Sequence, residues 1–90
     1  MKRGAVAMMP LICLHELAPG QRGRVAQIHT TGAMRRRLLD IGLLENTTVE
    51  CVGRSPGGDP SAYLIRGAVI AIRAQDSHHI LVQREEEIWG

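Results

Sequence analysis

The chain has 90 residues, which suits one small domain and leaves no room for a second core, and it contains no apolar run of the roughly 20 residues that a membrane span requires. Because the chain has no Phe, one Tyr and one Trp, its core must be built mainly from aliphatic residues. Its two cysteines, Cys13 and Cys51, are too few and too far apart for a disulfide framework or a CxxC metal site. We therefore expect the protein to work in a reducing compartment. Ten of the eleven basic residues are arginine and three of the nine acids are residues 85–87, so residues 1–84 carry a net charge of +5, which suits nucleic acid, an anionic membrane surface or an acidic protein as a partner.

The amino-terminal part is predicted to be an extension followed by a short lead-in. Residues 1–13 are interrupted by glycine and proline and are followed by no signal-peptide cleavage site, so we expect a flexible extension that is not a secretion signal. Two leucines then precede Pro19-Gly20, a dipeptide typical of a type II turn, and this pattern favours a short helical or bent segment. Residues 23–30 alternate in hydrophobicity, which predicts the first strand.

The next segment is predicted to be a helix with arginines on its outer side. It begins after Thr31, and apolar residues then recur at spacings of four and three, which places them on one helical stripe: Met34, Leu38 and Ile41. Gly42 fits the left-handed position that ends such a helix. Residues 35–37, all arginine, lie mostly off the stripe, and Leu39 lies beside it, so we expect Leu39 to be partly exposed.

The rest of the chain predicts a series of short strands. Asn46 tolerates the positive φ of a turn before a β-rich segment over residues 48–54, and residues 55–60 contain two Pro and two Gly, which makes a protruding loop. Arg66-Gly67 separates two apolar runs and is a strong hairpin signal. The remaining strands are predicted over residues 62–65, 68–73 and 80–82. About five short strands, with one short α-helix inserted after the first, predict a mainly β fold and a small, strongly bent barrel.

Several motifs follow one another in a specific order and spacing. They are LxxLxPG at residues 14–20, Gly23-x-Val25, RRRLLDIGLL at residues 35–44, SPGGDPSAYLIRG at residues 55–67, Ile70-Ala71-Ile72-Arg73, and Asp76. Together they make the chain resemble the FeoA family, the small cytosolic component of bacterial ferrous iron uptake. The resemblance implies an SH3-like barrel domain over residues 14–84, followed by an acidic carboxy-terminal tail over residues 85–90.

The resemblance also implies an accessory, regulatory role in ferrous iron transport. The protein would bind the cytosolic part of FeoB, the GTP-dependent membrane transporter, and would be cytoplasmic, peripheral to the inner membrane through that partner and without inserting into the membrane itself. The chain has no GxxxxGKS phosphate-binding loop, so it is not the transporter. The same fold occurs as the C-terminal domain of DtxR-type repressors, so a metal-responsive regulatory domain is an alternative. Weak self-association as a homo-oligomer is left open.

Residues able to bind a metal are present, but none has the spacing of a known ligand motif. The weak candidates are His15, Glu16, Cys51, His78 and His79, beside Cys13 and His29. None forms a CxxC, HxxxH or ExxH pair, and the adjacent His78 and His79 would point to opposite sides of an extended segment. We therefore predict no specific metal site and no cofactor, beyond at most weak binding of a divalent metal.

Catalysis and nucleic-acid binding are both disfavoured. Asp76, Ser77 and His78 are consecutive, whereas a nucleophile and its base must converge from separate positions, so we predict no enzymatic activity. Nucleic-acid binding is the main alternative from another class, because the arginines could form a basic stripe. Tyr63 and Trp89 are the only aromatic residues, which is too few for a base-stacking platform, so no nucleic-acid partner is expected.

A protein-docking face suits the residues better. Arginine is favoured at interfaces because its planar fork makes bidentate contacts with carboxylates, and an exposed leucine beside it can supply a desolvated centre. We predict that the face combines the helix with the Pro/Gly loop and consists of Arg35, Arg36, Leu39, Leu43, Pro56, Asp59 and Pro60.

Overall fold

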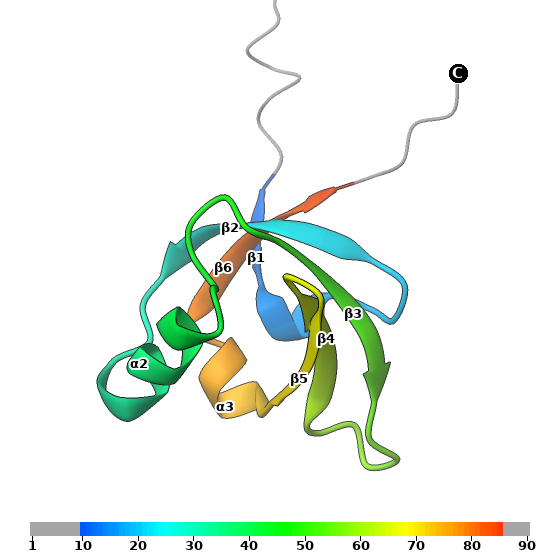
Figure 1. Cartoon of the computed structure of the whole chain (residues 1–90). Coiled ribbons are helices and arrows are strands. Elements are labelled where there is room, and N and C mark those ends of the chain that lie inside the picture. Colours follow the sequence, from blue (N-terminus) through cyan, green and yellow to red (C-terminus); the bar gives the residue numbers. More distant parts are fainter. Residues whose placement is uncertain (1–9, 86–90) are drawn as a thin grey trace, which may run out of the picture.

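The computed structural model describes residues 10–85, which form one strongly curved antiparallel sheet with short helices at its ends (Figure 1). The elements are β1 (Leu11–Cys13), the 3₁₀ helix η1 (Leu14–Glu16), β2 (Arg22–Ile28), α2 (Gly32–Asp40), β3 (Thr48–Arg54), β4 (Ser61–Ile65), β5 (Ala68–Ile72), α3 (Ala74–Ser77) and β6 (Ile80–Glu85). The six strands lie in the order β1-β6-β2-β3-β4-β5. The predicted mainly β fold is confirmed, with six strands instead of about five. None of these helices is long and apolar enough to cross a bilayer.

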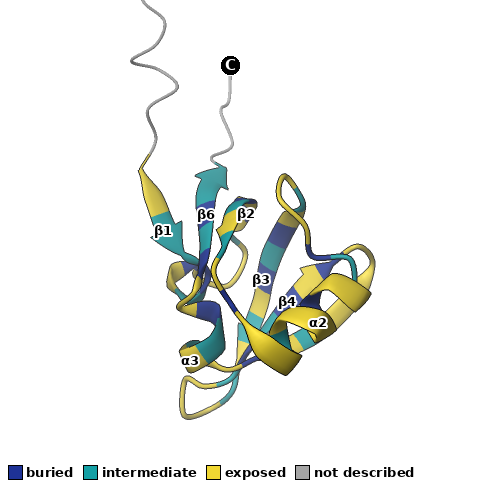
Figure 2. Ribbon diagram, turned by 90° about the vertical axis from the view of Figure 1, so that its left-hand side faces the viewer, coloured by how far each residue is buried: buried dark blue, intermediate teal, exposed yellow. Residues whose placement is uncertain are grey.

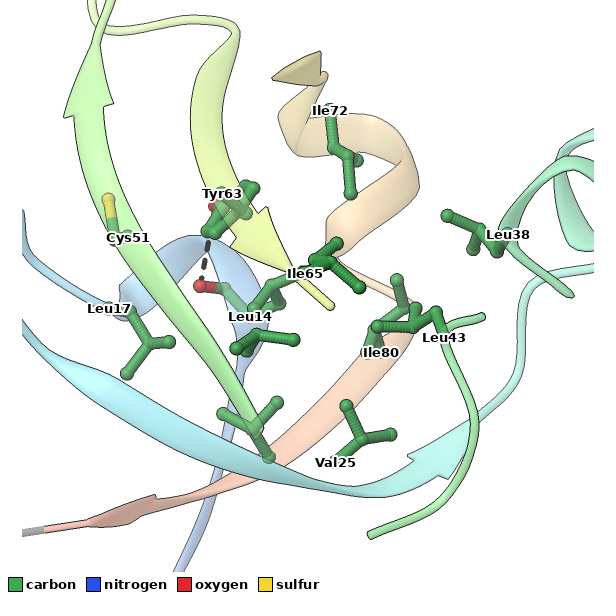
Figure 3. Packing of buried hydrophobic residues seen from close by; sticks show 12 residues of the cluster. Leu14, Leu17, Val25, Leu38, Leu43, Cys51, Tyr63, Ile65, Ile72 and Ile80 are labelled. Atoms are coloured by element: carbon green, nitrogen blue, oxygen red, sulfur yellow. Dashed lines mark hydrogen bonds between the residues drawn. The ribbon is translucent and has the colours of Figure 1, made fainter. Parts of the chain in front are cut away.

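The sheet bends around an aliphatic core. The register shifts between Val25 and Gln27 in β2 and between Cys51 and Gly53 in β3, and irregularities of this kind increase the local twist of a strand. The enclosed side chains are Leu14, Leu17, Val25, Leu38, Leu43, Val49, Cys51, Tyr63, Ile65, Ile72, Ile80 and Val82. Figure 3 shows that they come from η1, the end of α2 and the inner face of the sheet. Burying one such aliphatic side chain stabilises the fold by about 1.5–3 kcal/mol.

The amino-terminal boundary differs from the expectation. Residues 11–13, placed by the sequence in a flexible extension, form β1 and pair with β6, with Leu11 opposite Gln83 and Cys13 opposite Leu81. Three residues are too few to show the alternation by which a strand is recognised, so only the pairing partner reveals this strand. Residues 1–9 and 86–90 lie outside the described residues. Glu85, predicted to begin the acidic tail, is the last residue of β6 and pairs with Arg24 at 3.2 Å.

A second difference is α3, a short helix that was not predicted and that begins directly after the predicted strand over residues 68–73. Asp59, at the tip of the β3–β4 loop, accepts a hydrogen bond from the backbone N–H of Ala74 at 2.8 Å. This contact satisfies one of the N–H groups that have no partner at a helix start. A loop residue that is distant in sequence therefore stabilises the first turn of α3.

Helix α2 ends as the sequence predicts, at a left-handed glycine. Gly42 has a φ of 92°, its N–H donates to the carbonyl of Leu39 at 3.0 Å, and the N–H of Leu43 donates to the carbonyl of Leu38 at 2.9 Å. These two bonds define a Schellman motif, in which the residue after the glycine turns back toward the last turn of the helix. Leu43 consequently packs into the core with Leu38. The predicted positive φ at Asn46 and the Arg66-Gly67 hairpin are also present, with φ of 76° at Asn46 and 50° at Arg66.

Candidate functional site

The surface beside α2 contains a shallow hollow of about 410 Å³ with a mixed apolar and charged lining. Its walls come from the end of β2, the outer side of α2 and the turn that leads into β3. The lining residues are Ile28, Arg35, Leu39, Leu44, Glu45 and Asn46. We call this set the α2 hollow. Most of α2 faces solvent, as the yellow ribbon in Figure 2 shows, so the hollow is accessible.

Two leucines in the α2 hollow are unusually exposed for their type. Leu39 is 41% exposed and Leu44 is 50% exposed, whereas Leu43 between them is 0% exposed. The predicted exposure of Leu39 is confirmed, but the placement of Leu43 on the docking face is wrong, because the Schellman motif turns its side chain inward. Sequence reasoning missed Leu44, although the predicted left-handed Gly42 was a signal for it, because the residue after such a glycine commonly packs back against the last turn of the helix.

The arginines of α2 differ in how they are held. The guanidinium of Arg35 donates to the carbonyl of Ile28 at 3.4 Å, a long contact between two residues that both line the α2 hollow. Arg36 is exposed on the outer side of the helix and does not line the hollow. A partner carboxylate could therefore meet Arg35 at the rim of the hollow, beside the two exposed leucines.

The Pro/Gly loop does not share the α2 hollow. In Figure 1 the tip of the β3–β4 loop and α2 lie at separate places on the molecule. Pro60 lines a different and smaller hollow of about 220 Å³, whereas Asp59 is engaged with Ala74. The structure therefore does not bring Pro56, Asp59 and Pro60 together with the α2 residues into one pocket, and the single face that the sequence suggested divides into two regions.

One group of potential ligands is brought together by the fold. Cys13, His15 and His78 offer ligand atoms that all lie within 4.8 Å of one another. Burial raises the pKa of the Cys13 thiol above its usual value, and the neighbouring Glu16 carboxylate raises it further through its charge and a side-chain hydrogen bond. We call these three residues the Cys/His cluster.

The other weak metal candidates lie elsewhere or take other roles. Cys51 is in the core, where its Sγ is 3.7 Å from the carbonyl oxygen of Gly53. Glu16 accepts the backbone N–H of Cys13 at 3.2 Å, and the ring of His79 lies edge to face with that of His78, with the ring centroids 5.6 Å apart. Of the residues named as candidates, the fold thus assembles His15 and His78 with Cys13 and leaves Cys51 apart.

Comparison with known proteins identifies the family. A family model described as the FeoA domain matches residues 12–84. The Fe(2+) transport protein A/Fe(2+) transporter FeoB fusion protein of Porphyromonas gingivalis is 29% identical over 70 residues, which covers 78% of this chain and 8% of the fusion protein. The chain therefore spans a small fraction of the length of that relative.

Solved structures agree with this assignment. The FeoA-like protein from Clostridium acetobutylicum superposes with a TM-score of 0.79 at 29% identity, covering 92% of this chain and 96% of that one. The zinc complex of FeoA from Stenotrophomonas maltophilia, described as an SH3 domain protein, has a TM-score of 0.72 at 23% identity, with 82% and 95% covered. A manganese-dependent transcriptional repressor has a TM-score of 0.70 at 22% identity, with 84% and 42% covered. The last two likenesses concern the fold alone, and the likeness to the SH3 domain protein confirms the predicted SH3-like architecture.

Proposed function

Because the chain belongs to the FeoA domain family, we propose that it is an accessory protein of ferrous iron uptake that binds the cytosolic part of a FeoB-type, GTP-dependent membrane transporter. The observation that carries this proposal is the relative in which transport protein A and the transporter FeoB form one polypeptide. Such a fusion keeps two modules at a high effective concentration, which is useful where they act on each other. Where the two modules are separate polypeptides, the first has to reach the second by docking.

We place the docking face at the α2 hollow. Protein interfaces concentrate their binding energy in a few side chains, often an arginine beside apolar residues that become desolvated on contact. Leu39 and Leu44, which precede and follow the buried Leu43 in the sequence, are exposed apolar side chains that line the hollow. Arg35 lines the same hollow. Arg36 adds positive charge on the same helix and would act mainly by steering an acidic partner. Pro56, Asp59 and Pro60 would form at most a second, separate contact.

The first prediction tests this face by binding. Leu39→Asp or Arg35→Glu should weaken binding to the purified cytosolic domain of the FeoB-type transporter by about 10-fold or more, because a central apolar contact or a rim charge is lost. The measurement is the dissociation constant from calorimetry at about 0.15 M salt, where charges further apart than about 8 Å are largely screened. Far-UV circular dichroism checks that each variant keeps the fold.

Two matched variants control for general effects of charge. The side chain of Leu64 is 36% exposed, a fraction similar to the 41% of Leu39, but it lies on β4 and does not line the α2 hollow. Leu64→Asp should therefore leave the affinity unchanged. Arg37→Glu is the matched control for Arg35→Glu, because it makes the same change of charge on the same helix at a residue that does not line the α2 hollow. Loss of binding in Leu64→Asp with normal binding in Leu39→Asp would move the docking face to the sheet. No binding by the unmodified chain would contradict the proposal as a whole.

Nucleic-acid binding gains no support from the packing of the aromatic residue. Tyr63, the only aromatic residue within the described part of the chain, is 0% exposed, so it cannot stack on a base. The arginines alone would give a weak, strongly salt-dependent interaction with phosphates. Titration with single-stranded DNA at low salt separates the two functions, since saturable binding that persists at about 0.15 M salt would favour the nucleic-acid alternative. We also propose no catalytic role for Asp76, Ser77 and His78, because Ser77 is buried and its hydroxyl donates to the carbonyl of Ala74 at 3.4 Å.

A further inference from the structure

The Cys/His cluster lies where three separate segments meet. Cys13 ends the edge strand β1, His15 lies in η1, and His78 is the residue that follows α3. The Sγ of Cys13 is 3.8 Å from the Nδ1 of His78, and the rings of His15 and His78 have centroids 5.6 Å apart. A thiol and an imidazole that lie 65 residues apart in sequence are thus gathered at one point of the surface, together with the imidazole of His15.

The backbone around the cluster is held by several independent contacts. Arg54 of β3 donates to the carbonyl of His15 at 3.3 Å and to that of Leu17 at 2.7 Å. The hydroxyl of Tyr63 donates to the carbonyl of Leu14 at 3.4 Å, and the N–H of His78 donates to that of Ala74 at 2.8 Å. These contacts fix the segments that carry the ligands before any ion arrives, which lowers the ordering cost of binding.

A second observation points to a missing partner. The Nδ1 atom of His15 is buried and has no hydrogen-bond partner within the described part of the chain. Buried polar atoms are nearly always hydrogen-bonded or bound to a metal, because leaving them without a partner costs free energy. His15 therefore carries a ring nitrogen whose lone pair or proton is unsatisfied in the protein alone.

The distances suit a tetrahedral ion. Zinc bonds of about 2.3 Å to sulfur and about 2.0–2.1 Å to nitrogen place neighbouring ligand atoms of a tetrahedron about 3.5 Å apart. The Cys13–His78 separation of 3.8 Å is close to this value, and the remaining separations, up to 4.8 Å, need side-chain movements of about 1 Å.

We propose that Cys13, His15 and His78 bind a divalent transition metal ion of borderline softness, for which Zn²⁺ is the best probe. A water or an exchangeable ligand completes the coordination. One thiolate and two imidazoles favour Zn²⁺ or Co²⁺ over hard ions such as Mg²⁺ and Ca²⁺, and the general affinity order places Zn²⁺ above Fe²⁺. The bound ion links β1 and η1 to the segment after α3, so it ties the amino-terminal edge of the sheet to its carboxy-terminal strand. This inference does not depend on docking to a transporter, and each can fail without the other.

The second prediction concerns metal binding by the purified chain without a polyhistidine tag. Calorimetry with Zn²⁺ should show one equivalent bound, and Co²⁺ should give a sulfur-to-metal charge-transfer band together with the visible bands of a tetrahedral site. Cys13→Ser should abolish the charge-transfer band. His78→Gln should weaken Zn²⁺ binding by more than about 100-fold, since even removing a residue that only orients a ligand costs about 10–100-fold.

The controls use the matched residues that the chain offers. His79→Gln removes the neighbouring imidazole and Cys51→Ala removes the other thiol, and both variants should bind Zn²⁺ as the unmodified protein does. In the unmodified chain, Zn²⁺ should also slow alkylation of Cys13 by iodoacetamide, as followed by mass spectrometry, which tests the thiol without any substitution. Absence of saturable Zn²⁺ binding, a charge-transfer band that survives in Cys13→Ser, or a loss of affinity in His79→Gln but not in His78→Gln would overturn the proposal.

Discussion

Arg54 and Tyr63 show how single residues hold the amino-terminal segment in place. Both side chains reach from the sheet to backbone carbonyls of the residues in and around η1, and the Tyr63 contact is buried (Figure 3). A short 3₁₀ helix has few hydrogen bonds of its own, so contacts of this kind determine whether it stays docked. Because η1 carries His15, the same two residues also determine the geometry of the Cys/His cluster.

The third prediction concerns the hydroxyl of Tyr63. Tyr63→Phe should lower the free energy of unfolding by about 1 kcal/mol, because the carbonyl of Leu14 loses its buried donor while the ring still fills the core. Urea denaturation of the two proteins at neutral pH measures the difference. A variant as stable as the parent would mean that water replaces the hydroxyl at this carbonyl.

The same residue should make stability depend on alkaline pH. Burial raises the pKa of Tyr63 above its usual value of 10.0, an effect that hydrogen bonding with Ser61 partly offsets. Above about pH 10 the unfolded chain therefore loses this proton while the folded chain keeps it, so stability falls as the pH rises toward the folded pKa. Unfolding curves between about pH 8 and about pH 11 should show a steeper loss for the parent than for Tyr63→Phe, whereas any contribution from Cys13 is common to both.

At the scale of elements, the end of α2 decides which of two adjacent leucines is exposed. The Schellman motif needs a positive φ at Gly42, and it directs Leu43 inward and leaves Leu44 at the α2 hollow. Gly42 also lies beneath the side chain of Arg66 from the β4–β5 hairpin, whose Cδ would clash with an added Cβ. The helix end, the α2 hollow and the hairpin therefore meet at this one glycine.

The fourth prediction separates these two demands on Gly42. Gly42→Ala should lower the free energy of unfolding by about 1–2 kcal/mol for the left-handed backbone alone, plus the cost of displacing Arg66. Gly32→Ala is the matched control, because Gly32 has a φ of 68° but open space around its Cα. Thermal or urea unfolding should show Gly42→Ala to be the less stable variant. In a chain that also carries Arg66→Ala, the difference in stability between Gly42→Ala and Gly32→Ala should be smaller. If Gly42→Ala and Gly32→Ala were equally stable both with and without Arg66, the Arg66 side chain would move aside without cost.

At the scale of the whole molecule, the sheet is open and ends at β1 and β5. Val69 on the edge strand β5 is 62% exposed, and its neighbour in register is Leu64, itself 36% exposed. An exposed apolar edge strand is a site where a second chain can pair, and natural proteins often protect such edges with lysine. This edge is the part of the described surface where weak self-association is most easily explained.

The fifth prediction follows from that edge. Val69→Lys should change the free energy of unfolding by less than about 0.5 kcal/mol, because the side chain is already in solvent. It should also reduce any concentration-dependent self-association, measured by sedimentation velocity over a range of protein concentrations. A clear loss of stability would instead indicate that Val69 is covered within the protein, and unchanged self-association would place the contact elsewhere.

Much of the fold could be predicted because it depends on local patterns. The strand over residues 48–54, the hairpin at Arg66-Gly67 and the glycine end of α2 follow from alternation, turn chemistry and allowed φ values, which nearby residues determine. Of the residues predicted for a docking face, Arg35 and Leu39 line the α2 hollow. Leu43 was misplaced because its direction depends on the geometry of the helix end and on the core that receives it.

The mainly β class, the place of the longest helix and the family resemblance follow from the amino-acid sequence, because they depend on the order and periodicity of neighbouring residues. The folded structure was needed to show that Asp59 stabilises the start of α3 and that Cys13, His15 and His78 meet. Each of these depends on pairing or packing between segments far apart in the chain, such as β1 against β6. No local pattern records such distances, because they arise when the curved sheet bends around its core.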